Sequence, residues 1–138
     1  MVPPRAIQVL GAGITCETLE DGCVTIFTLT DMTRITVDIW VDACDTLMRT
    51  AVDTHTPVRI IQDLSHPNVT QTPYSQERGQ ALQDAYPELQ GRIAVILPNN
   101  HASHRIRLFF KRQNNRYRQR DVFFTREAAL EWLNEVME

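Results

Sequence analysis

The sequence lacks an apolar run long enough to cross a membrane. Although 43% of its 138 residues are hydrophobic, no window approaches the roughly 20 apolar residues of a transmembrane helix. Residues 1–15 contain an early arginine but no sustained apolar stretch before a cleavage-like site, so no signal peptide is expected. We therefore predict no association with a membrane.

Cysteine is scarce, and the three cysteines that are present cannot all pair within one chain. Cys16 and Cys23 flank an Asp-Gly dipeptide at 21–22, which is typical of a two-residue hairpin turn. Such a turn places Cys16 opposite Phe27 rather than opposite Cys23, and Cys44 lies on a helical apolar stripe. We expect three reduced thiols, which favours a cytoplasmic location.

Internal repeats, low-complexity tracts and Gly/Ser-rich linkers are also absent from the sequence. The chain length is close to the commonest size of a single domain, and the charged fraction of 22% is ordinary for a globular protein. The prediction is one domain over residues 1–138, built around one hydrophobic core.

Strands and helices alternate along the chain. The first element predicted is a β-hairpin, because the segments on both sides of the Asp-Gly turn are rich in β-branched residues. Capping residues and apolar positions spaced by three and four predict four helices. The predicted strands are Ile14–Leu19, Cys23–Leu29, Val58–Gln62, Ile93–Leu97 and Val122–Phe124. The predicted helices run from Val37 to about Asp53 after a Thr36 cap, from Pro73 to about Tyr86 after a Thr72 cap, over 101–114, and onward from a Thr125 cap.

This order predicts an α/β fold with a mixed, mostly parallel sheet. Strands separated by helices pair in parallel through right-handed crossovers, and the hairpin adds an antiparallel edge. The uninterrupted apolar run Ile93–Leu97 indicates a central strand buried on both faces, with Val58–Gln62 beside it. The helical positions predicted to face the core are Trp40, Cys44, Leu47, Met48 and Ala51, then Ala102, Ile106, Phe109 and Phe110, and finally Ala129, Leu130, Leu133 and Val136.

The element order resembles that of the STAS/SpoIIAA-like family, the bacterial anti-sigma-factor antagonists and related domains. Residues 60–65, Ile-Ile-Gln-Asp-Leu-Ser, are similar to the family's third strand, which commonly ends in an Asp-Leu-Ser-type sequence. Residues 122–133, Val-Phe-Phe-Thr-Arg-Glu-Ala-Ala-Leu-Glu-Trp-Leu, are similar to its closing strand and helix. The resemblance covers about residues 14–137. It implies an N-terminal hairpin, about four helices and a non-enzymatic regulatory or protein-interaction role.

The phosphorylation motif of that family is incomplete in this chain. In the partner-switching members, an Asp-Ser pair followed by Gly sits at a helix N-terminus shortly after the third strand, and its serine is phosphorylated. Here the corresponding segment is Gln71-Thr72-Pro73-Tyr74, which places Thr72 near the acceptor position without the acidic neighbour or the glycine. We predict that Thr72 is a helix cap and that the usual phosphorylation does not regulate this chain.

No segment has the residue pattern of an active site, a cofactor site or a metal site. Residues 63–66, Asp-Leu-Ser-His, supply the residue types of a hydrolytic triad, but triads are assembled from distant segments, so a turn is favoured. His101 and His104 share one helical turn without the further ligands that zinc requires. Residues 11–13, Gly-Ala-Gly, lack the third glycine and the following helix of a dinucleotide loop. We predict no catalytic residue, cofactor or metal.

Basic and acidic residues are separated along the chain. Within an overall net charge of −3, residues 1–90 have a balance of −7 and residues 121–138 a balance of −4, whereas 91–120 carry eight basic groups and no acid. Only one of the eight is lysine, which favours planar bidentate contacts to carboxylate or phosphate. Nucleic-acid stacking is disfavoured because Tyr117 is the one aromatic residue expected to be exposed there. The eight residues are Arg92, Arg105, Arg107, Lys111, Arg112, Arg116, Arg118 and Arg120.

Three explanations of this basic segment stay open: a solvated face, a surface for an acidic protein or a second copy, and a site for nucleic acid or phosphate. The predicted interaction surface is Arg105, Lys111, Arg112, Arg116, Arg118, Thr72 and Tyr74. The leading hypothesis is a module that acts through a protein partner or as a homodimer. The alternative is a small-ligand-binding or enzymatic domain that uses the crevice at the strand carboxyl ends, and a polar pocket near Asp63, Asn99 and Thr72 would favour it. A weaker alternative is nucleic-acid binding through residues 92–120.

Overall fold

The computed structural model describes residues 6–19, 23–114 and 117–135, which contain four helices and one six-stranded sheet. The strands are β1 (Ala6–Gly11), β2 (Ile14–Leu19), β3 (Val24–Leu29), β4 (Val58–Asp63), β5 (Gly91–Ile96) and β6 (Arg118–Phe123). The helices are α1 (Arg34–Thr54), α2 (Pro73–Ala85), α3 (His101–Gln113) and α4 (Arg126–Leu133).

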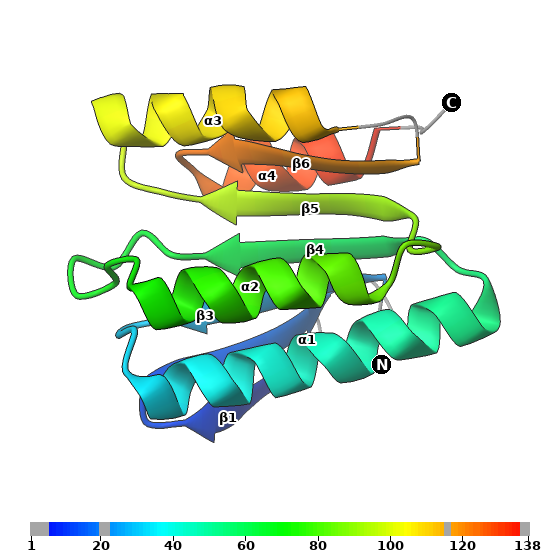
Figure 1. Cartoon of the computed structure of the whole chain (residues 1–138), viewed down its shortest axis with the longest axis horizontal. Helices are drawn as coiled ribbons and strands as arrows, with labels where there is room; N and C mark the ends of the chain where they lie inside the picture. The colour runs from blue at the N-terminus through cyan, green and yellow to red at the C-terminus, as the bar shows by residue number, and fades with distance from the viewer. Residues whose placement is uncertain (1–5, 20–22, 115–116, 136–138) are drawn as a thin grey trace.

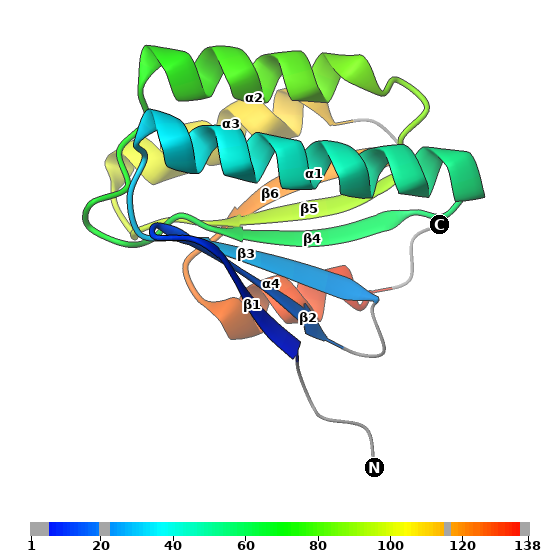
Figure 2. The same ribbon diagram turned by 90° about the horizontal axis from the view of Figure 1, so that it is seen from below.

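The six strands lie side by side in chain order (Figure 1). Strands β1, β2 and β3 are antiparallel, whereas β3, β4, β5 and β6 are parallel. Each of α1, α2 and α3 connects two neighbouring parallel strands, and because such crossovers share one hand, the three helices cover the same face of the sheet. Helix α4 follows β6 and covers the opposite face (Figure 2). The predicted α/β class, with its N-terminal hairpin, mixed sheet and four helices, is confirmed.

Apolar side chains fill both faces of the sheet. On the face of α1, α2 and α3, strand residues such as Ile60, Ile93 and Val95 pack with the stripe predicted for α1. On the other face, Ile61 and Ala94 pack against α4. Residues 93–96 of β5 are all buried, and β4 lies beside β5, so the predicted placement of these two strands is confirmed.

The first strand, β1, is not predicted by the sequence pattern. It pairs with β2 and forms the antiparallel edge of the sheet in place of the predicted hairpin. Ile7 and Val9 are exposed on β1, because α4 packs against β4, β5 and β6 and leaves that side of β1 uncovered. The predicted β2–β3 register is confirmed, with Cys16 opposite Phe27, while the Asp-Gly turn at 21–22 lies outside the described residues.

Helix α1 begins one turn earlier than predicted. Its N-cap is Thr33, whose hydroxyl accepts a hydrogen bond from the Thr36 amide, so the predicted Thr36 cap is wrong. The Asp31 carboxylate explains the shift, since it accepts from both the amide and the hydroxyl of Thr33. Hydrogen bonds from Thr36 and Thr33 also lower the pKa of Asp31. A Cβ on Gly13 would lie 2.2 Å from an Asp31 carboxylate oxygen, so this close approach requires glycine.

Helix α3 presents a different face to the sheet from the one predicted. Ala102 and Phe109 are exposed, which contradicts their predicted inward positions, while Ile106 and Phe110 are half-buried. The inward side is completed by Ser103, which is buried, so the stripe is rotated relative to the predicted one. The physical reason is position: α3 lies over the edge strand β6 and packs against it, so only a narrow strip of the helix is covered.

The predictions for the C-terminal helix and for the cysteines agree more closely with the structure. Thr125 caps α4, and Ala129 and Leu133 are buried on its inner side as predicted, while Val136 lies outside the described residues. All three cysteines are free. Burial raises the pKa of the Cys44 thiol to about 12, as expected for a thiol on a core stripe.

Candidate functional site

The predicted interaction residues lie on three different elements. Thr72 and Tyr74 are at the start of α2, Arg118 is on β6, and Arg105, Lys111 and Arg112 are on α3. Arg116 lies outside the described residues. Some of these side chains bond to other parts of the chain and so support its structure. Others are exposed and could contact a partner.

Thr72 is the N-cap of α2, as predicted. The Ser75 amide donates to the Thr72 hydroxyl at 3.0 Å, and the Ser75 hydroxyl accepts from the Thr72 amide at 2.9 Å, which completes a capping box. The neighbouring Tyr74 is also engaged within the chain. Its hydroxyl donates to Asp38, and the guanidinium of Arg34 lies 4.2 Å from the centroid of its ring.

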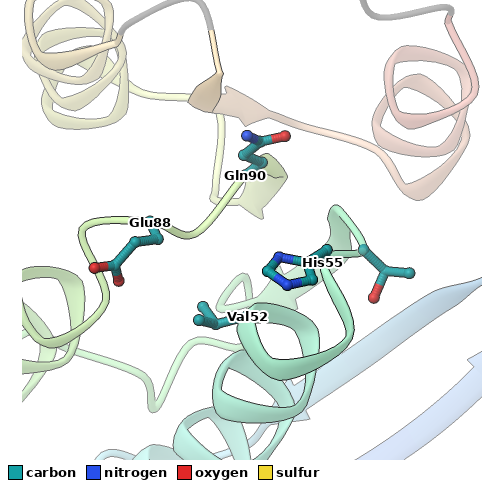
Figure 3. Close-up of a pocket in the computed structure, with 5 residues that line it drawn as sticks. Val52, His55, Glu88 and Gln90 are labelled. Carbon is teal, nitrogen blue, oxygen red and sulfur yellow. The ribbon is translucent and has the colours of Figure 1, made fainter.

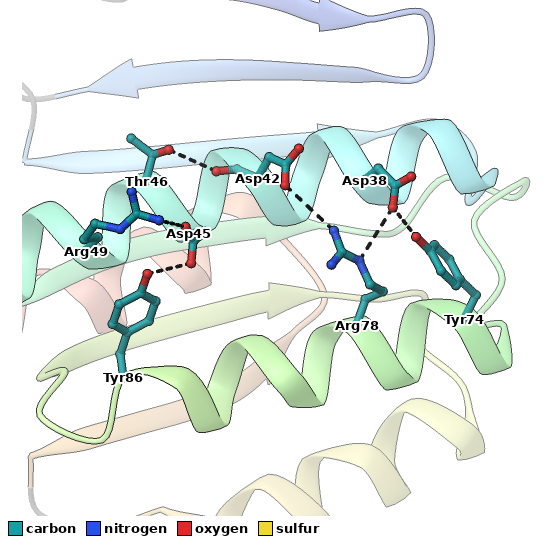
Figure 4. A network of polar contacts seen from close by, with 8 residues as sticks. All are labelled: Asp38, Asp42, Asp45, Thr46, Arg49, Tyr74, Arg78 and Tyr86. Atoms are coloured by element: carbon teal, nitrogen blue, oxygen red, sulfur yellow. Dashed lines mark hydrogen bonds and ion pairs between the residues drawn. The ribbon is translucent and has the colours of Figure 1, made fainter.

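A polar network joins α1 to α2 along their length (Figure 4). Arg78 on α2 lies 3.6 Å from Asp38 and 3.8 Å from Asp42, both on α1. One turn further along α1, Asp45 pairs with Arg49 and accepts a hydrogen bond from the Tyr86 hydroxyl at 2.6 Å. Much of the acidic surface of α1 is therefore already paired within the chain.

Three arginines of the basic segment donate hydrogen bonds to backbone carbonyls inside the protein, although the sequence gives no sign of it. Arg92 donates to the Trp132 carbonyl at 2.6 Å, and Arg107 donates to the Val122 carbonyl at 3.0 Å. Arg118 donates to the carbonyls of Gln83 and Tyr86, which end α2. These contacts fix helices to strands far away in the sequence.

The remaining cations project from the outer face of α3. Arg105, Lys111 and Arg112 are exposed, and among the described residues no ion pair joins them to a carboxylate. Leu108 and Phe109 lie between them and are 58% and 53% exposed. Residues 105, 108, 109 and 112 share one side of the helix because they are three or four positions apart. Sequence reasoning missed Leu108 and assigned Phe109 to the core.

A pocket of about 140 Å³ opens at the carboxyl ends of β4 and β5. Asp63, Asn99 and Thr72 do not line it, although their neighbours Gln62, Pro98 and Gln71 do. Asp63 turns instead toward Ser65, whose amide and hydroxyl donate to its carboxylate at 3.1 and 2.6 Å, which confirms the predicted turn at 63–66. Most lining side chains are apolar: Met32, Leu64, Val69, Val95, Leu97, Pro98, Ile106 and Phe110.

Among the described residues, Arg120 is the one charged residue that lines this pocket. Its guanidinium carbon lies 4.1 Å from the Phe110 ring centroid, and its Nη2 donates to the Gln113 side chain at 2.8 Å. Burial, followed by repulsion from Arg118, lowers the pKa of Arg120. Arg120 also lines a second, polar hollow of about 210 Å³, together with Gln83, Asp84, Gln113 and Arg118. Arg120 thus lines both an apolar pocket and a polar one.

A further pocket and two of the histidines offer fewer groups for binding or catalysis. A pocket of about 140 Å³ at the opposite end of the parallel strands is lined by Val52, His55, Thr56, Glu88 and Gln90 (Figure 3). His55 is there because it ends α1 in a left-handed conformation, with φ of 55°. In α3, His104 lies 3.0 Å from the Asn99 side-chain oxygen. Across residues 6–19, 23–114 and 117–135, no three His, Cys, Asp or Glu side chains are grouped to hold a metal.

Comparison with protein-family models, with curated proteins and with solved structures gives no match to this chain. In the part of the chain that the structure describes, no helix is long and apolar enough to cross a membrane.

Proposed function

We propose that this protein is a non-enzymatic regulatory module that binds an acidic partner protein through the outer face of α3. The observation that carries the proposal is the exposed pair Leu108 and Phe109, flanked by Arg105 and Arg112 on the same face. Protein interfaces commonly combine an apolar, aromatic centre with arginine. A helix face of this kind offers both components within two turns.

Charge complementarity determines the kind of partner. The outer face of α3 presents three cations, and α3 itself contains no acidic residue, so it suits an acidic surface with exposed apolar side chains. A second copy of this chain suits it less well. Asp38, Asp42 and Asp45 on α1 already pair with Arg78 and Arg49, so these three carboxylates have cationic partners within their own chain.

Two further observations support the proposal. The hairpin, mixed sheet and four helices agree with what the STAS/SpoIIAA-like resemblance implies for the fold, and that resemblance implies a protein-interaction role. The half-buried Thr72 hydroxyl is used in the helix cap, which fits regulation without the family's usual phosphorylation. We place the protein in the cytoplasm because Cys16, Cys23 and Cys44 are free.

The test uses an amphipathic peptide of about four helical turns, with leucine on one face and glutamate elsewhere, in a fluorescence anisotropy titration. We expect the full chain to bind this probe and expect binding to weaken as salt rises. Replacing Phe109 with serine should weaken binding by about tenfold or more, because it removes the aromatic anchor. The double change Arg105→Gln with Arg112→Gln should also weaken it.

The matched control is Thr50→Glu with Gln76→Glu, two exposed positions on α1 and α2 that alter net charge by the same amount. This control should retain most of the affinity. Failure of the peptide to bind, or equal loss in the control, would contradict the proposal. If sedimentation shows a dimer that Phe109→Ser dissociates, the partner is a second copy of this chain and not an acidic partner protein. Tight binding of DNA or RNA with a steep salt dependence would show that the partner is a nucleic acid and not a protein.

A further inference from the structure

We propose that the pocket at the carboxyl ends of β4 and β5, beside α3, binds a small carboxylate whose apolar body is about the size of a benzene ring. Arg120 would hold the carboxylate, and the apolar wall below it would hold the body. The pocket is a different surface from the outer face of α3, so this proposal does not depend on the proposed function.

The bonding of Arg120 differs from that of the other inward arginines. Arg92, Arg107 and Arg118 each donate to a backbone carbonyl. Among the described residues, the guanidinium of Arg120 donates only to the Gln113 side chain. A guanidinium has five N–H donors in a planar fork. The donors left over on Arg120 suit the two oxygens of a carboxylate, which arginine binds bidentately.

No carboxylate of the described residues binds the guanidinium of Arg120. Neither an ion pair nor a hydrogen bond joins Arg120 to a carboxylate in the described structure. Asp84, which lines the neighbouring hollow, interacts electrostatically with Arg118 rather than with Arg120. A half-buried cation without an internal counter-ion is costly, and an anionic ligand would offset that cost.

The shape and lining of the pocket limit the body of the ligand. Its volume of about 140 Å³ is close to that of an engineered apolar cavity of about 150 Å³ that binds benzene. Val95, Leu97, Ile106 and Phe110 form an apolar wall next to Arg120. An apolar wall favours a monocarboxylate over a phosphate dianion, because desolvation costs more for two charges than for one.

The amides of Gln62 and Gln71 give the pocket a second polar side. Gln62 is only 7% exposed and lies in register with Val95, which also lines the pocket. Gln62 lies at the carboxyl end of β4, and Gln71 lies in the loop that leads from β4 to α2. The carboxyl ends of parallel strands are where α/β sheets commonly bind ligands. The two amides suit a ligand with a hydroxyl or carbonyl group opposite its carboxylate.

The experiment titrates the full chain with sodium benzoate and, separately, with benzyl alcohol, which has the same ring without the charge. Binding is followed by calorimetry and by two-dimensional NMR. We expect benzoate to bind and to shift the signals of Val95 and Ile106, and benzyl alcohol to bind about tenfold more weakly or not at all. Arg120→Met should remove this preference, and Ile106→Trp, which fills the pocket, should abolish binding of both compounds.

The control is Arg112→Gln on the outer face of α3, which should bind benzoate as the wild type does. Equal affinity for the two compounds, no binding of benzoate to the wild type, or full benzoate binding by Ile106→Trp would each overturn the proposal. If Arg120→Met does not fold, as judged by circular dichroism, the comparison of the two compounds on the wild type and Ile106→Trp still decides it. Loss of peptide binding without loss of benzoate binding would affect only the proposed function.

Discussion

At the scale of single residues, the arginines of segment 92–120 do two different things. Some donate to backbone carbonyls at the ends of helices or strands, as Arg118 does at the end of α2. Others, such as Arg105 and Arg112, are exposed. The planar guanidinium explains the first group, because its several N–H donors let one side chain reach two carbonyl oxygens at a helix end. Both groups come from the same arginine-rich segment of the sequence, so only their contacts in the structure distinguish them.

The contact between Arg118 and α2 leads to a prediction for stability. Arg118→Met removes the donors to the Gln83 and Tyr86 carbonyls while keeping a side chain of similar length. We expect the free energy of unfolding to fall by about 1–3 kcal/mol. Urea denaturation followed by circular dichroism measures it. The same substitution at the exposed Arg105 should change stability by no more than about 0.5 kcal/mol, and equal losses at both sites would refute the structural role of Arg118.

At the scale of elements, α2 is held by polar contacts more than by an apolar stripe. Its buried residues are only Ser75 and Leu82. Its start is fixed by the Thr72 capping box, and its side by the network of Arg78, Tyr74 and the aspartates of α1. Hydrogen bonds at the helix start satisfy amides that have no partner within the helix. A helix with so few buried apolar residues therefore depends on its cap.

Replacing Thr72 tests this dependence. Thr72→Ala should lower the free energy of unfolding by about 0.5–2 kcal/mol, because the Ser75 amide loses its acceptor. Thr72→Ser keeps the hydroxyl and should preserve most of the stability. Thermal melting of the three proteins checks the result. A Thr72→Ala protein as stable as the wild type would show that the capping box contributes little.

At the scale of the whole molecule, β5 lies between two apolar layers. Residues 93–96 are buried, and its neighbours β4 and β6 are parallel to it. The helices α1, α2 and α3 on one face and α4 on the other exclude water from both sides (Figure 2). Ile96 is 3% exposed and packs in the apolar cluster on the face of α4, so a charge at this position has no route to solvent.

Ile96→Asp should therefore unfold the protein. Burial of an unpaired carboxylate costs several kcal/mol, comparable with the whole stability of a domain, which is about 5–15 kcal/mol. The control is Val9→Asp, which places the same carboxylate on the edge strand β1, where the valine is 73% exposed. Circular dichroism and thermal melting should show an unfolded Ile96→Asp protein and a folded Val9→Asp protein. A cooperative melt from Ile96→Asp would contradict the burial of this position.

The sequence by itself determined the elements whose signals are local. The run Ile93–Leu97 predicted a buried strand, Thr72-Pro73 predicted a helix start, and the segments around 21–22 predicted a hairpin in the correct register. Each signal depends on neighbours in the chain, through alternation, spacing or a cap. The alternation of strands and helices was also sufficient to predict a mostly parallel sheet.

Tertiary structure decided what depends on distant neighbours. Which side of α3 faces the sheet, and therefore whether Phe109 is core or surface, follows from the place of α3 above the edge strand. Whether an arginine is a surface charge, a structural contact or the lining of a pocket follows from carbonyls and rings contributed by other elements. Arg118 and Arg120 are two positions apart on the same strand, yet only Arg118 meets helix carbonyls. No local pattern carries that difference, because it depends on which groups of α2 and α3 lie within reach of each side chain.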